Sequence, residues 1–111
     1  MFNRLNRLSK TKDVQVTSKR GRSFFSPHFV IKFLKSQTAV TRITVVVSTK
    51  VSKKAVIRNR IKRVIRETLR LNLPALKSGD YVVIVKPSAT KLETPLIRQQ
   101  VLGLLRSARL L

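Results

Sequence analysis

The residues of this sequence that could do chemistry are cations gathered between positions 58 and 70. The stretch holds six Arg and Lys residues and one acid, Glu67, so most of its charges repel one another. Bound phosphates would relieve that repulsion, because a guanidinium offers a bidentate fork to phosphate oxygens. Asn59 lies among these cations, and its amide could hydrogen-bond a base, a sugar or a phosphate.

Three lysines extend the cationic stretch toward the amino terminus, where the backbone amides of a helix start would also favour an anion. The residues that we expect to face a nucleic acid are Lys50, Lys53, Lys54, Arg58, Asn59, Arg60, Lys62, Arg63, Arg66 and Arg70.

The overall charge points to the same class of partner. The 111 residues include 25 Lys and Arg against 4 Asp and Glu, a net charge of +21 that is typical of proteins that bind a polyanion. The apolar runs are far shorter than the roughly 20 residues needed to span a bilayer, so we expect no membrane contact. No secretory signal is recognisable and there are no cysteines, which predicts a cytoplasmic protein.

Groups suited to catalysis are scarce. A protein nuclease needs a general acid and base, or carboxylates that hold metal ions. His28 is the single histidine, and the four acids, Asp13, Glu67, Asp80 and Glu93, are dispersed along the chain. We therefore predict neither a catalytic residue nor a metal ligand in this chain.

A helix from Lys54 to about Leu71 must position the cations. Its apolar residues recur at spacings of three and four and would form one core-facing side: Ile57, Ile61, Val64, Ile65, Thr68 and Leu69. The cations fall on the opposite side of the helical wheel. Two further helices are expected, from Ser9 to about Arg20 and from an N-cap at Thr94 with Pro95 in the first turn.

The β-branched and aromatic residues predict the strands. Phe24–Phe25 and Phe29–Leu34 are strand pieces separated by Pro27, Tyr81–Lys86 is a strand, and the unbroken valines of Arg42–Thr49 suggest a central strand. These elements indicate one α+β domain, residues 9–111, in which helices pack on a small mixed sheet in the order αβββαβα. Residues 1–8 form a separate basic segment whose Arg4 and Arg7 could contact phosphate.

At this point the sequence resembles a known family, the bacterial ribonuclease P protein component. The run AVIRNRIKRVIRE, Ala55–Glu67, is similar to the signature of that family. Asn6–Leu8 with Asp13, Gly21 and Phe29–Val30 resembles the amino-terminal half of its members, and Gly79–Ile84 resembles their last strand. Nearly the whole chain is covered.

The resemblance implies a two-layer sandwich with a left-handed βαβ crossover, which is rare among such connections. It also implies a function: binding the catalytic RNA of ribonuclease P and the 5′ leader of precursor tRNA, to promote endonucleolytic 5′ maturation of tRNA. In that reading the chain is an accessory subunit of an enzyme whose chemistry and magnesium ions belong mainly to the RNA. No obligate protein partner is implied.

The resemblance further implies a leader-binding cleft between the first helix and the sheet, with Val14, Ser18, Lys32 and Lys86 as its candidate residues. Members of the family often carry aromatic residues at positions matching Val14, Ser18 and Lys32, and this sequence has none there. Stacking could instead come from nearby Phe24, Phe25 and Phe33, but we expect these three in the core.

Two other classes of protein share the composition. A small ribosomal protein would also be basic and lack catalytic groups, although many such proteins carry their charge on long tails. A DNA-binding regulator would usually place a helix and a short turn before its recognition helix, whereas a β-rich stretch precedes this one. The ribosomal protein is the stronger of these two alternatives.

Overall fold

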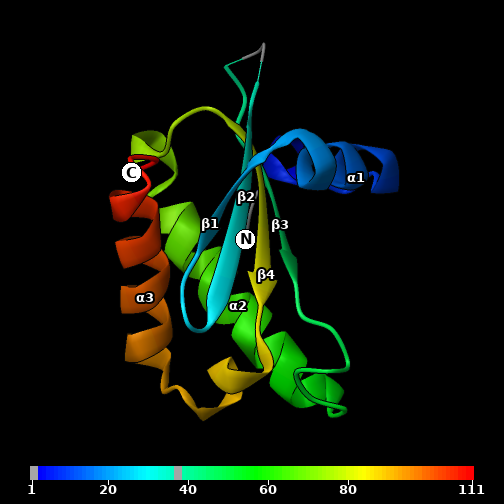
Figure 1. Cartoon of the computed structure of the whole chain (residues 1–111), viewed down its shortest axis with the longest axis vertical. Helices are drawn as coiled ribbons and strands as arrows, with labels where there is room; N and C mark the ends of the chain where they lie inside the picture. Colours follow the sequence, from blue (N-terminus) through cyan, green and yellow to red (C-terminus); the bar gives the residue numbers. More distant parts are fainter. Residues whose placement is uncertain (1–2, 37–38) are drawn as a thin grey trace.

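The elements of the chain follow the predicted order of helices and strands. The computed structural model describes residues 3–36 and 39–111. Within them lie α1 (Thr11–Arg20), β1 (Arg22–Phe25), β2 (Phe29–Lys35), β3 (Arg42–Val46), α2 (Ala55–Leu71), β4 (Gly79–Val85) and α3 (Thr94–Ser107), with short 3-10 turns at Arg4–Asn6, Leu73–Ala75 and Pro87–Lys91. Figure 1 shows α2 and α3 on one face of the sheet and α1 on the other.

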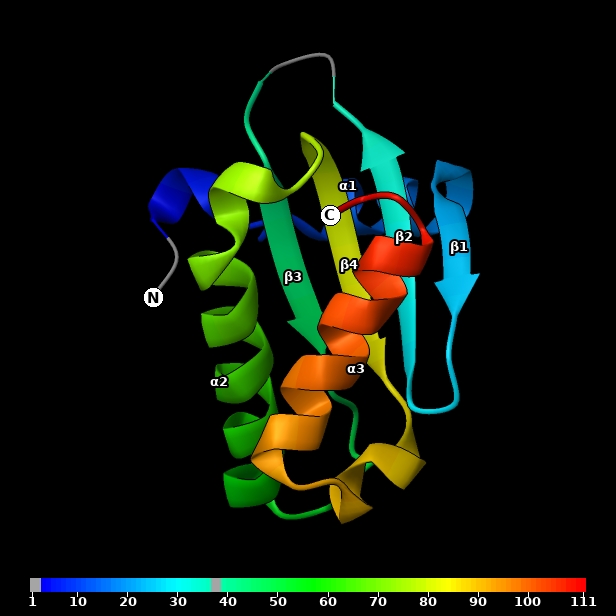
Figure 2. The same cartoon turned by 90° about the vertical axis from the view of Figure 1, so that its left-hand side faces the viewer.

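The sheet is mixed, and its strand order is β1-β2-β4-β3. β2 is antiparallel to both of its neighbours, whereas β3 and β4 are parallel and are joined through α2. In Figure 2 the helices α2 and α3 face the viewer, β3 and β4 point down, and β4 lies to the right of β3. That arrangement makes the β3–α2–β4 crossover left-handed, against the usual hand of such connections, as the resemblance implied.

The core lies between the sheet and the two helices α2 and α3. The predicted apolar side of α2 is buried at Ile61, Ile65, Thr68 and Leu69, and α3 contributes Ile97, Val101, Leu104 and Leu105. Burial of each large apolar side chain stabilises the fold by roughly 1.5–3 kcal/mol. No helix in the described ranges combines the length and the apolar character that crossing a bilayer requires.

β3 lies at an edge of the sheet, so the prediction of a central strand was wrong. Its apolar run alternates in burial: Val45 is buried, whereas Val46 is 38% exposed on the other face. The strand ends at Val46, and Val47 is buried beyond it. The free edge is partly covered by the amino-terminal segment, because the amide of Leu8 donates to the carbonyl of Ile43 at 3.0 Å.

Two smaller expectations also need correction. The N-cap of α3 is Glu93 rather than Thr94, because the carbonyl of Glu93 already accepts the amides of Leu96 and Ile97. Phe25 is not a core residue: it ends the edge strand β1 and is 70% exposed. Phe33 is buried and Phe24 packs partly against the core, as expected.

Replacing Gly21 or Gly103 by alanine should change the free energy of unfolding in opposite directions. A Cβ at Gly21 would lie 2.4 Å from the carbonyl oxygen of Thr17 and 2.8 Å from that of Phe33, whereas a Cβ at Gly103 in α3 would meet nothing within 4 Å. Gly21→Ala should lower the free energy of unfolding by about 1–3 kcal/mol. Gly103→Ala should raise it by up to about 1 kcal/mol, because alanine favours the helix. Urea denaturation measures both, and equal effects of the two changes would contradict the packing described.

Candidate nucleic-acid interface

The solvent side of α2 carries the cations predicted from the sequence. Asn59, Arg60, Arg63 and Arg66 are exposed, and Lys62 is half-buried. Within residues 3–36 and 39–111, no carboxylate forms an ion pair with any cation between positions 58 and 66. Their charge is therefore available to an external anion.

Two members of the predicted set are engaged within the protein. Arg58 donates from Nη1 to the carbonyl oxygen of Ser52 at 2.8 Å, which ties the first turn of α2 to the preceding loop. Arg70 donates two hydrogen bonds to Glu67, which lowers the pKa of the Glu67 carboxyl and raises the pKa of Arg70. Glu67 thus partly compensates the carboxyl-terminal end of the cationic face, and we expect Arg70 to contribute less to phosphate binding than Arg63.

The loop before α2 presents the remaining lysines. Lys50, Lys53 and Lys54 are all exposed, and Lys54 is the N-cap of α2. No side chain caps this helix start, and the first turn contains no acid. The loop and the helix therefore form one continuous positive surface, and its potential adds to that of the helix dipole.

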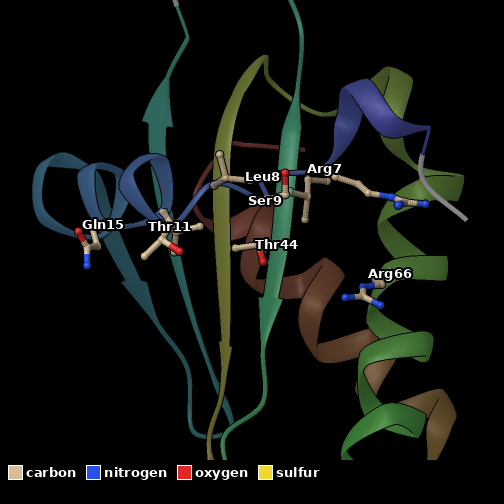
Figure 3. Close-up of a pocket in the computed structure, with 9 residues that line it drawn as sticks. Arg7, Leu8, Ser9, Thr11, Gln15, Thr44 and Arg66 are labelled. Carbon is tan, nitrogen blue, oxygen red and sulfur yellow. The ribbon is translucent and has the colours of Figure 1, made fainter.

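A pocket of about 470 Å³ lies beside this surface, between α1 and β3 (Figure 3). Its walls come from the amino-terminal segment, α1, β3 and α2: Arg7, Leu8, Ser9, Thr11, Val14, Gln15, Ile43, Thr44 and Arg66. In Figure 3 the side chains of Arg7 and Arg66 extend into the space between β3 and α2. Of the four residues expected in the leader-binding cleft, Val14 lines this pocket.

Ser18 and Lys32 meet at the other end of α1. The ammonium of Lys32, on β2, donates to the carbonyl oxygen of Ser18 at 3.2 Å, so this cation also attaches α1 to the sheet. Lys86 lies apart from them, just past the last residue of β4, and donates to the carbonyl oxygen of Ser26 at 2.8 Å. Val14 and Ser18 thus lie on α1 and Lys32 contacts this helix. Lys86 is separate from them, just past the carboxyl-terminal end of β4.

Sequence reasoning missed Thr44 and Gln15 as pocket residues. Thr44 lies between Ile43 and Val45, both buried, so strand alternation alone places it on the face away from α2 and α3. Gln15 had no comparable signal, because α1 has few buried residues from which its orientation could be inferred.

A further contact that the sequence did not indicate connects α1, β3 and β4. Arg42 donates from Nε and Nη2 to the two carboxylate oxygens of Asp80, at 2.9 and 2.7 Å, and from Nη1 to Asp13 at 3.2 Å. These hydrogen bonds, that to Asp80 first, raise the pKa of Arg42. We call this set of three residues the Arg42 clamp.

The acids and the histidine of the described residues do not gather into a metal site. No three of their His, Asp and Glu side chains come close enough to hold a metal ion. His28 is half-buried, and its Nδ1 lies 2.7 Å from the hydroxyl oxygen of Ser88 rather than beside an acid. The arrangement of these residues is suited to binding an anion on a surface next to a pocket.

Comparison with known proteins places this fold and surface in a family. The fold is a small mixed sheet with a left-handed crossover through a cationic helix, which is the class of protein that the resemblance implied. Residues 2–109 match the family model for Ribonuclease P. The chain belongs to the ribonuclease P protein family.

Related proteins agree with that assignment. The chain is 49% identical over 67 residues to the ribonuclease P protein component of Xanthomonas oryzae pv. oryzae, covering 60% of this chain and 46% of that protein. It is 41% identical over 86 residues to the component from Exiguobacterium sp., covering 78% of this chain and 75% of that protein. The aligned region thus spans about half the length of the Xanthomonas relative.

Solved structures share the fold over most of the chain. The RNase P protein of Staphylococcus aureus superposes with a TM-score of 0.90 at 29% identity, covering 95% of this chain and 96% of that one. The RNase P protein from Thermotoga maritima superposes with a TM-score of 0.82 at 31% identity, covering 91% and 96%. Both were solved as RNase P proteins.

The exposed cations of α2 predict that RNA affinity depends strongly on salt concentration. If the protein neutralises about six phosphates, the logarithm of its affinity for a folded RNA should fall with log salt at a slope near −5. Arg63→Ala should weaken binding about fivefold and reduce the slope by about one, because one phosphate contact is lost. Filter binding across a salt series measures both quantities.

Arg106→Ala is the matched control, because Arg106 is also exposed and the change removes the same charge from α3 instead of α2. It should leave the affinity within about twofold of the unchanged protein. Equal losses for the two variants would show that only net charge matters, and would contradict an interface on α2.

Proposed function

We propose that this chain is the protein subunit of a ribonuclease P ribonucleoprotein and binds its catalytic RNA through α2. The observation that carries the proposal is the exposed row of cations from Arg60 to Arg66, which no carboxylate of the described residues neutralises. The phosphates of an RNA backbone would serve as the anionic partners of these cations. Family membership supports the identity of that RNA.

The second part of the proposal concerns precursor tRNA. We place its single-stranded 5′ leader against α1, in the pocket beside Val14 and along the sheet face that carries Lys32. Arg7 and Arg66 flank the pocket and Thr44 adds a hydroxyl, so a strand there would find both phosphate partners and a hydrogen-bond donor. With Val14, Ser18 and Lys32 in place of aromatic residues, the contacts would be mainly ionic and polar.

The proposed reaction is hydrolysis of one phosphodiester, which releases the leader and matures the 5′ end of the tRNA. We assign the magnesium ions mainly to the RNA subunit, because the carboxylates of this chain do not fit a metal site. Asp13 and Asp80 share Arg42, and Glu67 is paired with Arg70. The chain then acts as an accessory subunit, which supplies affinity and position to an RNA-catalysed reaction in the cytoplasm.

Reconstitution tests the proposal directly. The catalytic RNA of the same organism is assayed for cleavage of precursor tRNA at low magnesium, with and without the protein. The protein should raise the cleavage rate, because its cations offset phosphate repulsion that magnesium otherwise screens. Arg60→Ala should reduce this stimulation while leaving the urea midpoint unchanged, since Arg60 is exposed. Cleavage that does not respond to the protein at any magnesium concentration would refute the proposed function.

A further inference from the structure

We propose that Arg42 is a positioning residue that holds α1 in place as one wall of the leader-binding groove, an inference that rests on the function proposed above. Arg42 lies on β3, and its guanidinium donates two hydrogen bonds to the carboxylate of Asp80 on β4. Its remaining nitrogen reaches Asp13, in the first turn of α1. One side chain therefore joins α1 to two neighbouring strands.

Within α1, little else holds the amino-terminal half on the sheet, although the chain just before it is attached to β3 through buried Leu8. Thr17 is the one buried residue of this helix, and it lies in the carboxyl-terminal half, as does the hydrogen bond from Lys32 to Ser18. Val14 and Val16 are only half-buried. Apolar burial thus holds α1 only weakly on the sheet. The hydrogen bond from Arg42 to Asp13 therefore helps to fix the position of the first turn of α1.

That first turn forms part of the groove. Thr11, Val14 and Gln15 line the pocket next to β3, and Val14 directly follows Asp13 in the chain. If Asp13 is released from Arg42, the pocket wall built from these residues loses its anchor. The inference predicts that the leader contact depends on the Arg42 clamp although no residue of the clamp lines the pocket.

The charges of the clamp argue against two simpler roles. Two carboxylates surround the single charge of Arg42, so this cation is poorly placed to attract phosphate. The side chains of Arg42 and Asp13 are 36% and 32% exposed, and an ion pair that water reaches this well adds little to global stability. The bidentate pair with Asp80, whose side chain is 11% exposed, instead joins β3 to β4. Orienting α1 is the role that the geometry leaves for the contact between Arg42 and Asp13.

The test uses the reconstituted holoenzyme and two precursor tRNAs, one with a leader of several nucleotides and one with a single-nucleotide leader. The ratio of the two affinities measures the contribution of the leader. Asp13→Asn should reduce this ratio by about three- to tenfold, although it removes a negative charge that would repel the leader phosphates. Arg42→Lys should reduce it similarly, because an ammonium cannot provide the bidentate contact while also reaching Asp13.

Glu93→Gln is the matched control, since it removes one negative charge, as Asp13→Asn does, at an exposed residue that makes no side-chain cap for α3. It should leave the ratio unchanged. Hydrogen exchange supplies a readout of position: the amides of α1 should exchange faster in Asp13→Asn, while those of α2 keep their protection.

The outcomes separate this inference from the function on which it rests. If Asp13→Asn keeps both the wild-type affinity ratio and the protection of α1, Arg42 does not position the helix. Faster exchange in α1 with an unchanged ratio would likewise overturn its role in the leader groove. Equal affinity of the unchanged protein for the two substrates would instead refute the leader site itself, and this inference with it.

Discussion

The contact of Arg42 with Asp80 and Asp13 joins α1 to the face of the sheet opposite α2 and α3. On the other face, α2 and α3 are held by a continuous apolar core, and their placement follows from burial. α1 buries a single residue and is held largely by polar contacts, so a pocket with both polar and apolar walls can exist beside it. The fold therefore uses hydrophobic packing to build a rigid support and ionic contacts to shape the surface that we propose for RNA.

The distribution of the few acids explains why the cationic surface stays available. Three of the four carboxylates pair with Arg42 or Arg70, two of them on the opposite face of the sheet from α2. The cations between Arg60 and Arg66 therefore repel one another in the free protein. Binding of phosphates would remove that repulsion, and the association should therefore depend strongly on salt.

Local patterns in the sequence were enough to predict the supporting elements. The three-and-four spacing from Ile57 to Leu69 identified both the buried side of α2 and the cationic side opposite it. The edge position of β3 was missed because Val47 continues the apolar run after the strand has ended. The Arg42 clamp could not be predicted from spacing, because its partners lie 29 and 38 positions away in the chain.

The central claim is that α2 serves a particular RNA, and recovery of that RNA from cells tests it most directly. The protein is purified from its own cell extract after crosslinking, the bound RNA is sequenced, and the crosslinked peptides are mapped. The account predicts that ribonuclease P RNA is strongly enriched and that its crosslinks fall on the loop and helix from Lys50 to Arg66. Recovery of ribosomal RNA alone would contradict the account and would favour a structural protein of the ribosome.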